Sequence, residues 1–306
     1  ATDGGVTLLG IKDSWPELEK LPWGTSKLCE ALVTKCTAAG LSVGFIDTYS
    51  DVDTVDDLFR LRHSLAKDPR LQQQNLAQDL RKILPDVTAV IPIQGDHNEL
   101  RSLVQQLQSQ HVDHIKVIEN GNSHSTKMFC EEYGIGYTSD SSNRGKRLDI
   151  GARSAHDGSI WFLHADTKLA SGAASSVRRT LLHNDAGFFT FCFSGDANAQ
   201  KKWLAKAINW RAKYFTPYGD QGLFVSKKVY LASGGFADEP LFEEVPLIKY
   251  LRRNARIVAI VDPIEVSDRR WQKDGWIKRT LHNRWLVVRY MLGASPTDLA
   301  NSYKGK

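Results

Sequence analysis

The chain has 306 residues, 42% of them apolar and 25% charged, which is an ordinary globular composition with room for one large α/β domain or two smaller ones. No run approaches the roughly 18–20 apolar residues that a membrane-spanning helix needs. Residues 201–306 carry 20 Lys and Arg against 10 Asp and Glu, whereas residues 1–200 carry 20 against 25. Because these basic residues alternate with apolar ones and accompany no recognised nucleic-acid module, we expect a phosphate-bearing substrate or an anionic surface as partner, and no nucleic acid.

The four cysteines form neither a CxxC nor a zinc-binding spacing: Cys29, Cys36, Cys130 and Cys192. Their scattered positions indicate reduced thiols, and we expect a cytoplasmic protein. The opening residues ATDGG have neither the basic nor the apolar region of a secretion signal.

The first 65 residues have a βαβα pattern. The predicted elements are a strand at Val6–Ile11, a helix at Ser26–Ala39 that ends at Gly40, a strand at Leu41–Ile46, and a helix capped at Asp53–Thr54 that runs through Leu65. Two strands cannot bury both faces of a sheet, so we expect residues 1–65 to be a partial domain that docks on another. Residues 66–86 are Gln-rich, polar and helical in pattern, and we interpret them as a linker.

A second pattern begins at Val87, where buried strands alternate with helices. The predicted strands are Val87–Ile93, His114–Glu119 and Ser159–Asp166, and the predicted helices are Asn98–Gln110, Ser125–Tyr133 and Arg147–Ala155. This alternation predicts a mostly parallel, doubly wound sheet over residues 87–306. In such a sheet the ligand binds beyond the carboxyl ends of the strands, where the polar clusters QGDHNE, ENGNS and HADT stand.

Asp166 ends an apolar strand, and one carboxylate in that place suits a hard cation such as Mg²⁺ or Mn²⁺ that bridges a diphosphate. A helix cap or a turn is the structural alternative for Asp166. For His164 we favour a hydrogen-bonded structural role over a second metal ligand.

Two later clusters contain further candidate side chains. The loop Tyr218-Gly219-Asp220-Gln221 has flanking glycines that let a ligand approach the backbone, although a polar turn explains it equally well. The acidic pair Glu243–Glu244 opens a helix, where carboxylates also favour the helix dipole, and a general base would be one of the two. Neighbours at a helix start point about 100° apart, so we expect only one of them to face the cleft.

The segment Arg269-Arg270-Trp271 offers guanidinium groups for a diphosphate and an aromatic ring for stacking, with a surface salt-bridge cluster as the alternative. The helix Trp276 to Leu292 places apolar residues three to four apart with arginines between them. It either packs on the domain or lies on anionic lipid as a peripheral membrane contact.

The ordered set IP, LHADT, PYGDQG, SGGF, the acidic pair and RRW resembles the family 2 glycosyltransferases, and it is most similar to the bacterial arsenosugar-biosynthesis branch. The resemblance covers residues 87–303. DGGVTLLGI, WPELEKLPWGTS and SDVDTVDDL in the first 65 residues resemble the C-terminal part of a companion nucleotidyl/glycosyltransferase-like family, without its nucleotide-binding half.

This resemblance implies a GT-A fold, a nucleotide-diphosphate sugar donor (usually a UDP-sugar), an unknown acceptor, and inverting transfer assisted by Mn²⁺ or Mg²⁺. It implies that Asp166 binds the metal and that Glu244 is the base. The residues implied to lie around the donor are Pro92, Glu119, Arg144, Lys146, Arg269, Arg270 and Trp271. Departures from the family pattern fall on the donor pocket and the base, among them Glu119 and Glu244 where the family has Asp. Two hypotheses follow: an active glycosyltransferase, or a catalytically silent protein that binds a nucleotide sugar or serves as a scaffold.

Overall fold

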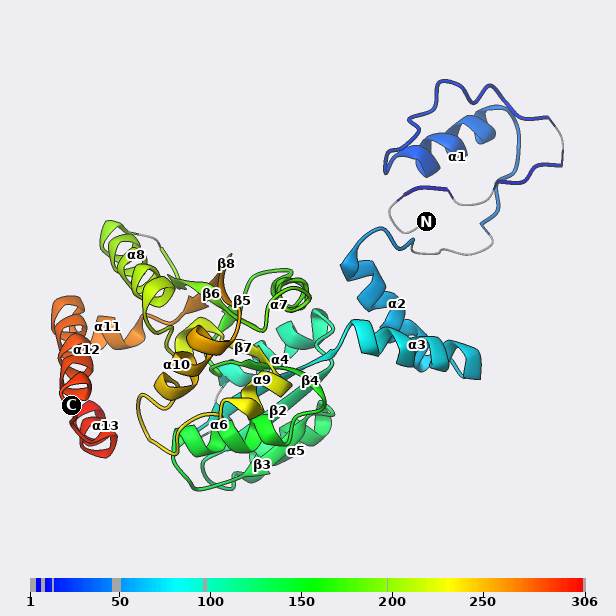
Figure 1. The fold of residues 1–306 in the computed structure, drawn as a ribbon. Coiled ribbons are helices and arrows are strands. Elements are labelled where there is room, and N and C mark those ends of the chain that lie inside the picture. The colour runs from blue at the N-terminus through cyan, green and yellow to red at the C-terminus, as the bar shows by residue number, and fades with distance from the viewer. Residues whose placement is uncertain are drawn as a thin grey trace. The chain divides into compact units, whose positions relative to one another are not determined.

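The computed structural model describes residues 4–6, 9–12, 14–45, 51–95, 98–196 and 198–304, apart from the side chains of Arg270 and Lys304. The chain forms two compact units, Ala1–Gln78 and Asp79–Lys306 (Figure 1). The boundary between them falls inside the segment that the sequence predicts as a linker. Among the described residues no helix is long and apolar enough to cross a membrane.

The first unit contains the helices α1 (Leu28–Ala38) and α2 (Val55–Lys67), and α3 (Leu71–Ile83) continues past its boundary. Both predicted helix signals are confirmed. Thr54 accepts a hydrogen bond from the backbone of Asp57, whose carboxylate accepts one in return, so the pair closes a capping box before α2. Gly40 has φ +76° just after α1, the left-handed conformation that glycine adopts at little cost.

The two strands predicted in this unit are not formed in the residues that the structure describes there. Val6, Leu9–Ile11 and residues 41–45 have no strand structure, and the remaining residues of the two segments, Thr7, Leu8 and Ile46, lie outside the described part. The local core is small and consists of Leu21, Leu28, Leu32 and Cys36. A strand pair without further neighbours gains little from such a core, which explains why the alternation in the sequence produces no sheet in the described part of this unit.

The second unit contains the remaining elements. In chain order they are β1 (Asp86–Ile93), α4 (Asn98–Ser109), β2 (His114–Glu119), α5 (His124–Glu132), β3 (Gly136–Ser139), α6 (Arg144–Arg153), β4 (Gly158–Phe162), β5 (Lys168–Leu169), α7 (Ala173–Leu181), β6 (Ala186–Phe193), α8 (Ala199–Tyr214), the 3-10 turn η1 (Gly219–Gln221), β7 (Phe224–Ser226), α9 (Lys227–Ala232), α10 (Val245–Asn254), β8 (Ile257–Val266), α11 (Arg269–Asp274), α12 (Trp276–Met291) and α13 (Pro296–Lys304).

Within the described residues eight strands form one sheet in the order β3-β2-β1-β4-β7-β6-β8-β5. Strands β3, β2, β1 and β4 are mutually parallel, β6 and β8 are parallel to each other, and β7 and β5 run against their neighbours. The mostly parallel sheet predicted from the sequence is therefore confirmed. The chain moves from β1 out to β2 and β3 and then returns to β4 on the other side of β1, which creates the crevice where α/β sheets bind ligands.

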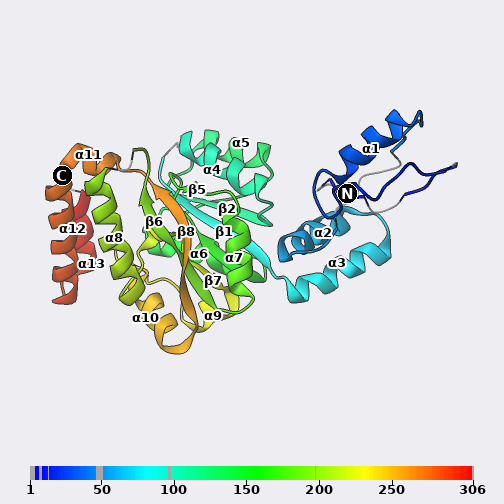
Figure 2. The same ribbon diagram turned by 90° about the horizontal axis from the view of Figure 1, so that it is seen from above.

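Helices cover both faces of the sheet, as the predicted double winding requires (Figures 1 and 2). Leu103, Val104 and Leu107 of α4 pack with Ala174 and Val177 of α7 on one face. A second core covers the other face, formed by α6, α9 and α10: Leu148, Ala152, Tyr230, Leu247 and Leu251. Neighbouring residues of β1 point to opposite cores, so the sheet is buried on both sides.

Candidate active site at the carboxyl edge of the sheet

Three segments that are distant in sequence meet at one edge of the sheet. β4 ends at Phe162, earlier than predicted, so Leu163–Asp166 form a loop beyond its carboxyl end. The 3-10 turn η1 precedes β7, and because β7 is antiparallel to β4, its amino end lies at the same edge. The chain direction alone thus brings the HADT and YGDQ segments together.

The amino end of α6 forms the third side of the site. Asn143 caps this helix by accepting a hydrogen bond from the backbone of Lys146, and it donates one to Asp238. Gly145 lies against the backbone of Ala237 and Glu239 and the side chain of Glu243, and a Cβ there would overlap the carbonyl oxygen of Ala237. Only glycine permits this approach, which places Arg144 opposite the acidic pair.

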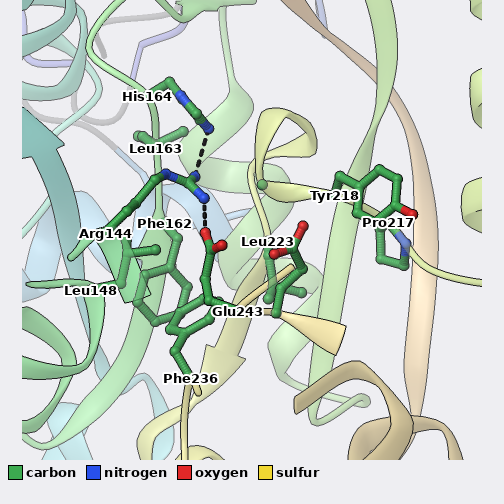
Figure 3. Close-up of a pocket in the computed structure, with 12 residues that line it drawn as sticks. Arg144, Leu148, Phe162, Leu163, His164, Pro217, Tyr218, Leu223, Phe236 and Glu243 are labelled. Atoms are coloured by element: carbon green, nitrogen blue, oxygen red, sulfur yellow. Dashed lines mark hydrogen bonds and ion pairs between the residues drawn. The ribbon is translucent and has the colours of Figure 1, made fainter. Parts of the chain in front are cut away.

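A pocket opens between these segments (Figure 3). It is lined by Arg144, Leu148, Phe162, Leu163, His164, Pro217, Tyr218, Gly219, Leu223, Phe236, Glu243 and Glu244. Both acidic residues line it, so the expectation that only one would face the cleft is wrong. The helix α10 begins at Val245, and Glu243 and Glu244 precede its regular turns, where helical spacing does not apply.

Arg144 connects two walls of the pocket. It forms an ion pair with Glu243, and its other terminal nitrogen lies 2.8 Å from Nε2 of His164 (Figure 3). A guanidinium group only donates, so Nε2 of His164 accepts and the ring proton is on Nδ1. His164 has the hydrogen-bonded role favoured from the sequence, and Glu243, only 1% exposed, has a cationic partner.

Glu244 is in a different position from its neighbour. It is 5% exposed, and its Oε2 has no hydrogen-bond partner among the described residues. Burial raises the pKa of this carboxyl group, Asp220 raises it further, and Arg144 and hydrogen bonding from the backbone of Gly219 oppose the shift. Burial likewise raises the pKa of Asp220. Glu244 is thus a buried carboxyl group with a lone pair available at the pocket.

An aromatic cluster supports the acidic pair from behind. Phe242 has φ +63°, an uncommon conformation for a residue with a side chain, and its ring lies 4.6 Å from that of Tyr290 in α12. The same cluster includes Leu286 and Tyr218. Arg211 of α8 stacks on Tyr218 at 4.1 Å, and burial raises the pKa of Tyr218 to about 12. The packing fixes the backbone just before Glu243.

Asp166 lies beyond the pocket wall and is more open to solvent. Its Oδ2 stands 3.7 Å from Nη2 of Arg269, and the same guanidinium donates to Oε1 of Glu99 at 2.6 Å. Arg269 thus contacts two carboxylates, one in the first turn of α4 and one in the loop after β4. The sequence pattern places Glu99 in a polar cluster but does not mark it as a site residue, because its partner Arg269 is 170 residues away.

None of the remaining described residues that the resemblance implies lines this pocket. Glu119 is buried, and its carboxylate accepts hydrogen bonds from Ser123, Thr126 and Tyr137. Trp271 packs edge-on against Phe193 and lies near Trp276. Pro92 lies near the end of β1, and Lys146 is exposed on α6. Gln221 is buried and donates a hydrogen bond to the backbone carbonyl of Phe189. The side chain of Arg270 and the residues Asp96 and His97 lie outside the described part.

Together, fold and pocket define an α/β protein whose carboxyl-edge pocket contains a buried acidic pair.

Neither protein-family models nor curated proteins match the sequence. Among solved structures, S. aureus TarS 1–349 in complex with UDP-GlcNAc is 14% identical with a TM-score of 0.46, over 60% of this chain and 58% of that one. Glucosyl-3-phosphoglycerate synthase from Mycobacterium tuberculosis in complex with Mn²⁺, UDP and glucosyl-3-phosphoglycerate is 13% identical with a TM-score of 0.46, over 71% of this chain and 77% of that one. The chain thus spans about three fifths of the TarS fragment. Both TM-scores are below 0.5, so the case for a function comes from the site itself.

Proposed function

We propose that residues 87–306 are a GT-A glycosyltransferase domain that moves a sugar from a nucleotide-diphosphate donor, with a UDP-sugar favoured, to a hydroxyl group of an acceptor. The observation that carries the proposal is the contrast within the acidic pair. Glu243 is neutralised by Arg144, whereas Glu244 keeps an unpartnered oxygen and a raised pKa at the same pocket.

Glu244 is the general base of this proposal. A buried carboxylate with a raised pKa takes a proton more readily than an exposed one, and a base is most effective when its pKa approaches the working pH. As the acceptor oxygen attacks the sugar, its proton passes to Glu244 and the bond to the nucleoside diphosphate breaks. A single base on the acceptor side suits direct displacement with inversion.

The open carboxylate of Asp166 is the proposed site for Mn²⁺ or Mg²⁺. Within the described residues no group of three or more His, Cys, Asp or Glu side chains could hold a metal ion. Such a group is not needed here, because Mg²⁺ in nucleotide sites is bound by one or two carboxylates, waters and phosphate oxygens. Asp166 and Glu99 fit that donor set. When bound, the cation would neutralise charge on the departing diphosphate.

Arg269 is the proposed cationic partner of the diphosphate. Its guanidinium bridges Glu99 and Asp166 at the open edge of the site, where a bidentate contact with phosphate oxygens can replace its contacts with carboxylates. The proposal extends to the remaining predicted donor contacts and keeps them as the resemblance implies them: Pro92, Glu119, Arg144, Lys146, Arg270 and Trp271. In this proposal the acceptor binds beside the loop Tyr218, Gly219, Asp220 and Gln221 and beside Glu243.

The second candidate is a catalytically silent protein that binds a nucleotide sugar or acts as a scaffold. The bonding of Glu119 favours it, because three hydrogen bonds already occupy the carboxylate that the resemblance assigns to the nucleoside base. A silent binder would keep donor affinity and lack transfer.

Thermal shift with a panel of nucleotide sugars, with and without Mn²⁺, tests the proposal. A donor held at a hundred times its Kd should add about 2.7 kcal/mol of stability. Product analysis with the donors that bind then separates the two candidates, since only a transferase releases the nucleoside diphosphate with a transferred sugar. A complete absence of stabilisation by any nucleotide sugar would contradict both the transferase and the silent binder, and would leave only the scaffold.

A further inference from the structure

Two helices of the second unit present large apolar side chains to solvent. On α12, Ile277, Leu281 and Trp285 recur every four residues, and Leu281 and Trp285 are 61% and 58% exposed. The helix packs on the domain, which is one of the two alternatives from the sequence, but this stripe does not take part in the packing. Leu286 and Tyr290 make the packing contacts instead, from another side of the helix.

The same pattern occurs on α8. Trp203, Trp210 and Tyr214 follow one another at spacings of seven and four residues, which places them on one face of the helix. Trp203 is 66% exposed, and the other two are exposed as well. Monomeric proteins rarely display several large apolar side chains together on their surface without using them.

The two helices lie at the same end of the unit in both views (Figures 1 and 2). They also share one small core, because Leu204 and Ile208 of α8 pack in the same cluster as Trp271 of α11 and Trp276 of α12. The two exposed stripes therefore belong to helices that pack against the same small core.

Charge identifies the kind of partner. Neither helix contains an acidic residue, whereas α8 carries five Lys or Arg and α12 carries four. Some of these point inward, such as Lys201, which pairs with Asp268 at 2.7 Å. Others are exposed beside the apolar stripes: Lys202, Lys206, Lys213, Lys278 and Arg284. A second copy of this face would bring like charges together, so self-association is disfavoured.

We propose that α8 and α12 form a docking face for an anionic lipid bilayer, in which both helices lie along the membrane surface. Lys and Arg on the polar side, with Trp and Leu on the other, are the signature of interfacial helices, and Trp favours the boundary between headgroups and acyl chains. The face is independent of the chemistry in the pocket, and it stands or falls separately from the proposed transfer.

Flotation of the full chain with vesicles tests this face. The chain should float with phosphatidylcholine vesicles that contain phosphatidylglycerol and not with phosphatidylcholine alone, and added salt should release it. Each basic residue near an anionic surface contributes about a fivefold gain in binding, so Lys202→Gln, Lys206→Gln and Lys213→Gln together should weaken it on the order of 100-fold.

The apolar stripe is tested by Leu281→Ser with Trp285→Ser, which should weaken vesicle binding about tenfold or more. Met128→Ser on α5 is the matched control, because Met128 is also an exposed large apolar residue and should leave binding unchanged. Donor-induced thermal shifts of the same variants report on the pocket separately. Equal recovery with neutral and anionic vesicles would overturn the proposal. So would a dimer of the parent chain, seen by light scattering, that the Leu281 and Trp285 substitutions dissociate, because it would assign the face to a second copy.

Discussion

Arg144 forms an ion pair with Glu243 across the pocket, from the first turn of α6 to the residue two positions before α10. The two residues are 99 positions apart in the chain. Their contact neutralises Glu243, whereas Glu244 has a buried Oε2 without a hydrogen-bond partner among the described residues.

The first prediction concerns this ion pair. Arg144→Gln leaves a buried carboxylate without its cation and should lower the free energy of unfolding by about 3 kcal/mol. The double variant Arg144→Gln, Glu243→Gln removes both charges and should recover most of that loss. Urea denaturation of the parent, both single variants and the double variant gives the coupling energy, and additive effects would show that the pair does not stabilise the fold.

A second prediction assigns the base. Glu244→Gln keeps the shape of the side chain and cannot accept a proton, so it should retain donor binding and lose transfer by roughly 100-fold or more. In the parent, the rate should fall on the acid side with a midpoint above the ordinary 4.5, because burial raises the pKa of Glu244. Normal turnover by Glu244→Gln together with an inactive Glu243→Gln would mean that the other residue is the base.

The raised pKa of Glu244 also predicts how stability changes with pH. The native state holds the proton of Glu244 more tightly than the unfolded chain, so stability falls as pH rises from the unfolded value of 4.5 through the raised native value. Glu244→Gln has no such loss. Its free energy of unfolding near neutral pH should exceed that of the parent by about 1.4 kcal/mol for each unit of the pKa shift, so it should melt at a higher temperature. The difference should vanish below pH 4.5.

Melting curves across this pH range check the third prediction. Glu131→Gln, on the exposed surface of α5, controls for the loss of one negative charge. If Glu244→Gln differs from the parent equally at all pH values, the effect comes from packing and not from protonation.

The fourth prediction concerns the metal. Asp166 is partly exposed, so Asp166→Ala should keep the fold and abolish the Mn²⁺ dependence of nucleotide binding. Glu99→Gln should weaken that dependence less, because Glu99 is bound to Arg269 at 2.6 Å. Thermal shift with UDP, with and without Mn²⁺, compares the two variants. Undiminished Mn²⁺-dependent binding in Asp166→Ala would rule out the assignment.

Regular patterning was sufficient to predict three of the four strands in the first half of the sheet. β1, β2 and β4 are rich in apolar residues and lie between helical patterns, and the structure confirms all three, whereas β3 is not predicted. No strand is predicted at Ala186–Phe193 or at Ile257–Val266, which became β6 and β8. Pro263 within β8 argues against a strand, and the structure accommodates it through a register shift opposite Phe189 and Thr190.

The geometry of the site was less accessible to sequence reasoning. Chain order and strand direction predict which segments meet at the carboxyl edge, and these expectations agree with the structure. The partners of Arg144, Arg211 and Arg269 depend on long-range packing, for which a single sequence gives no periodic signal. The same limit explains the outward stripe of α12, because helical spacing identifies an apolar face and does not identify what covers it.

The contact between Phe242 and Tyr290 places α12 between the pocket and the exposed stripe of the docking face. One side of the helix supports the residue before the acidic pair, while the stripe with Leu281 and Trp285 faces outward. If that stripe rests on a bilayer, the thickness of one helix, about 10 Å, sets the height of the pocket above the lipid. An acceptor hydroxyl carried on a lipid headgroup would then have to extend that far from the membrane surface to reach Glu244. The helix would therefore select acceptors by the length of their headgroup.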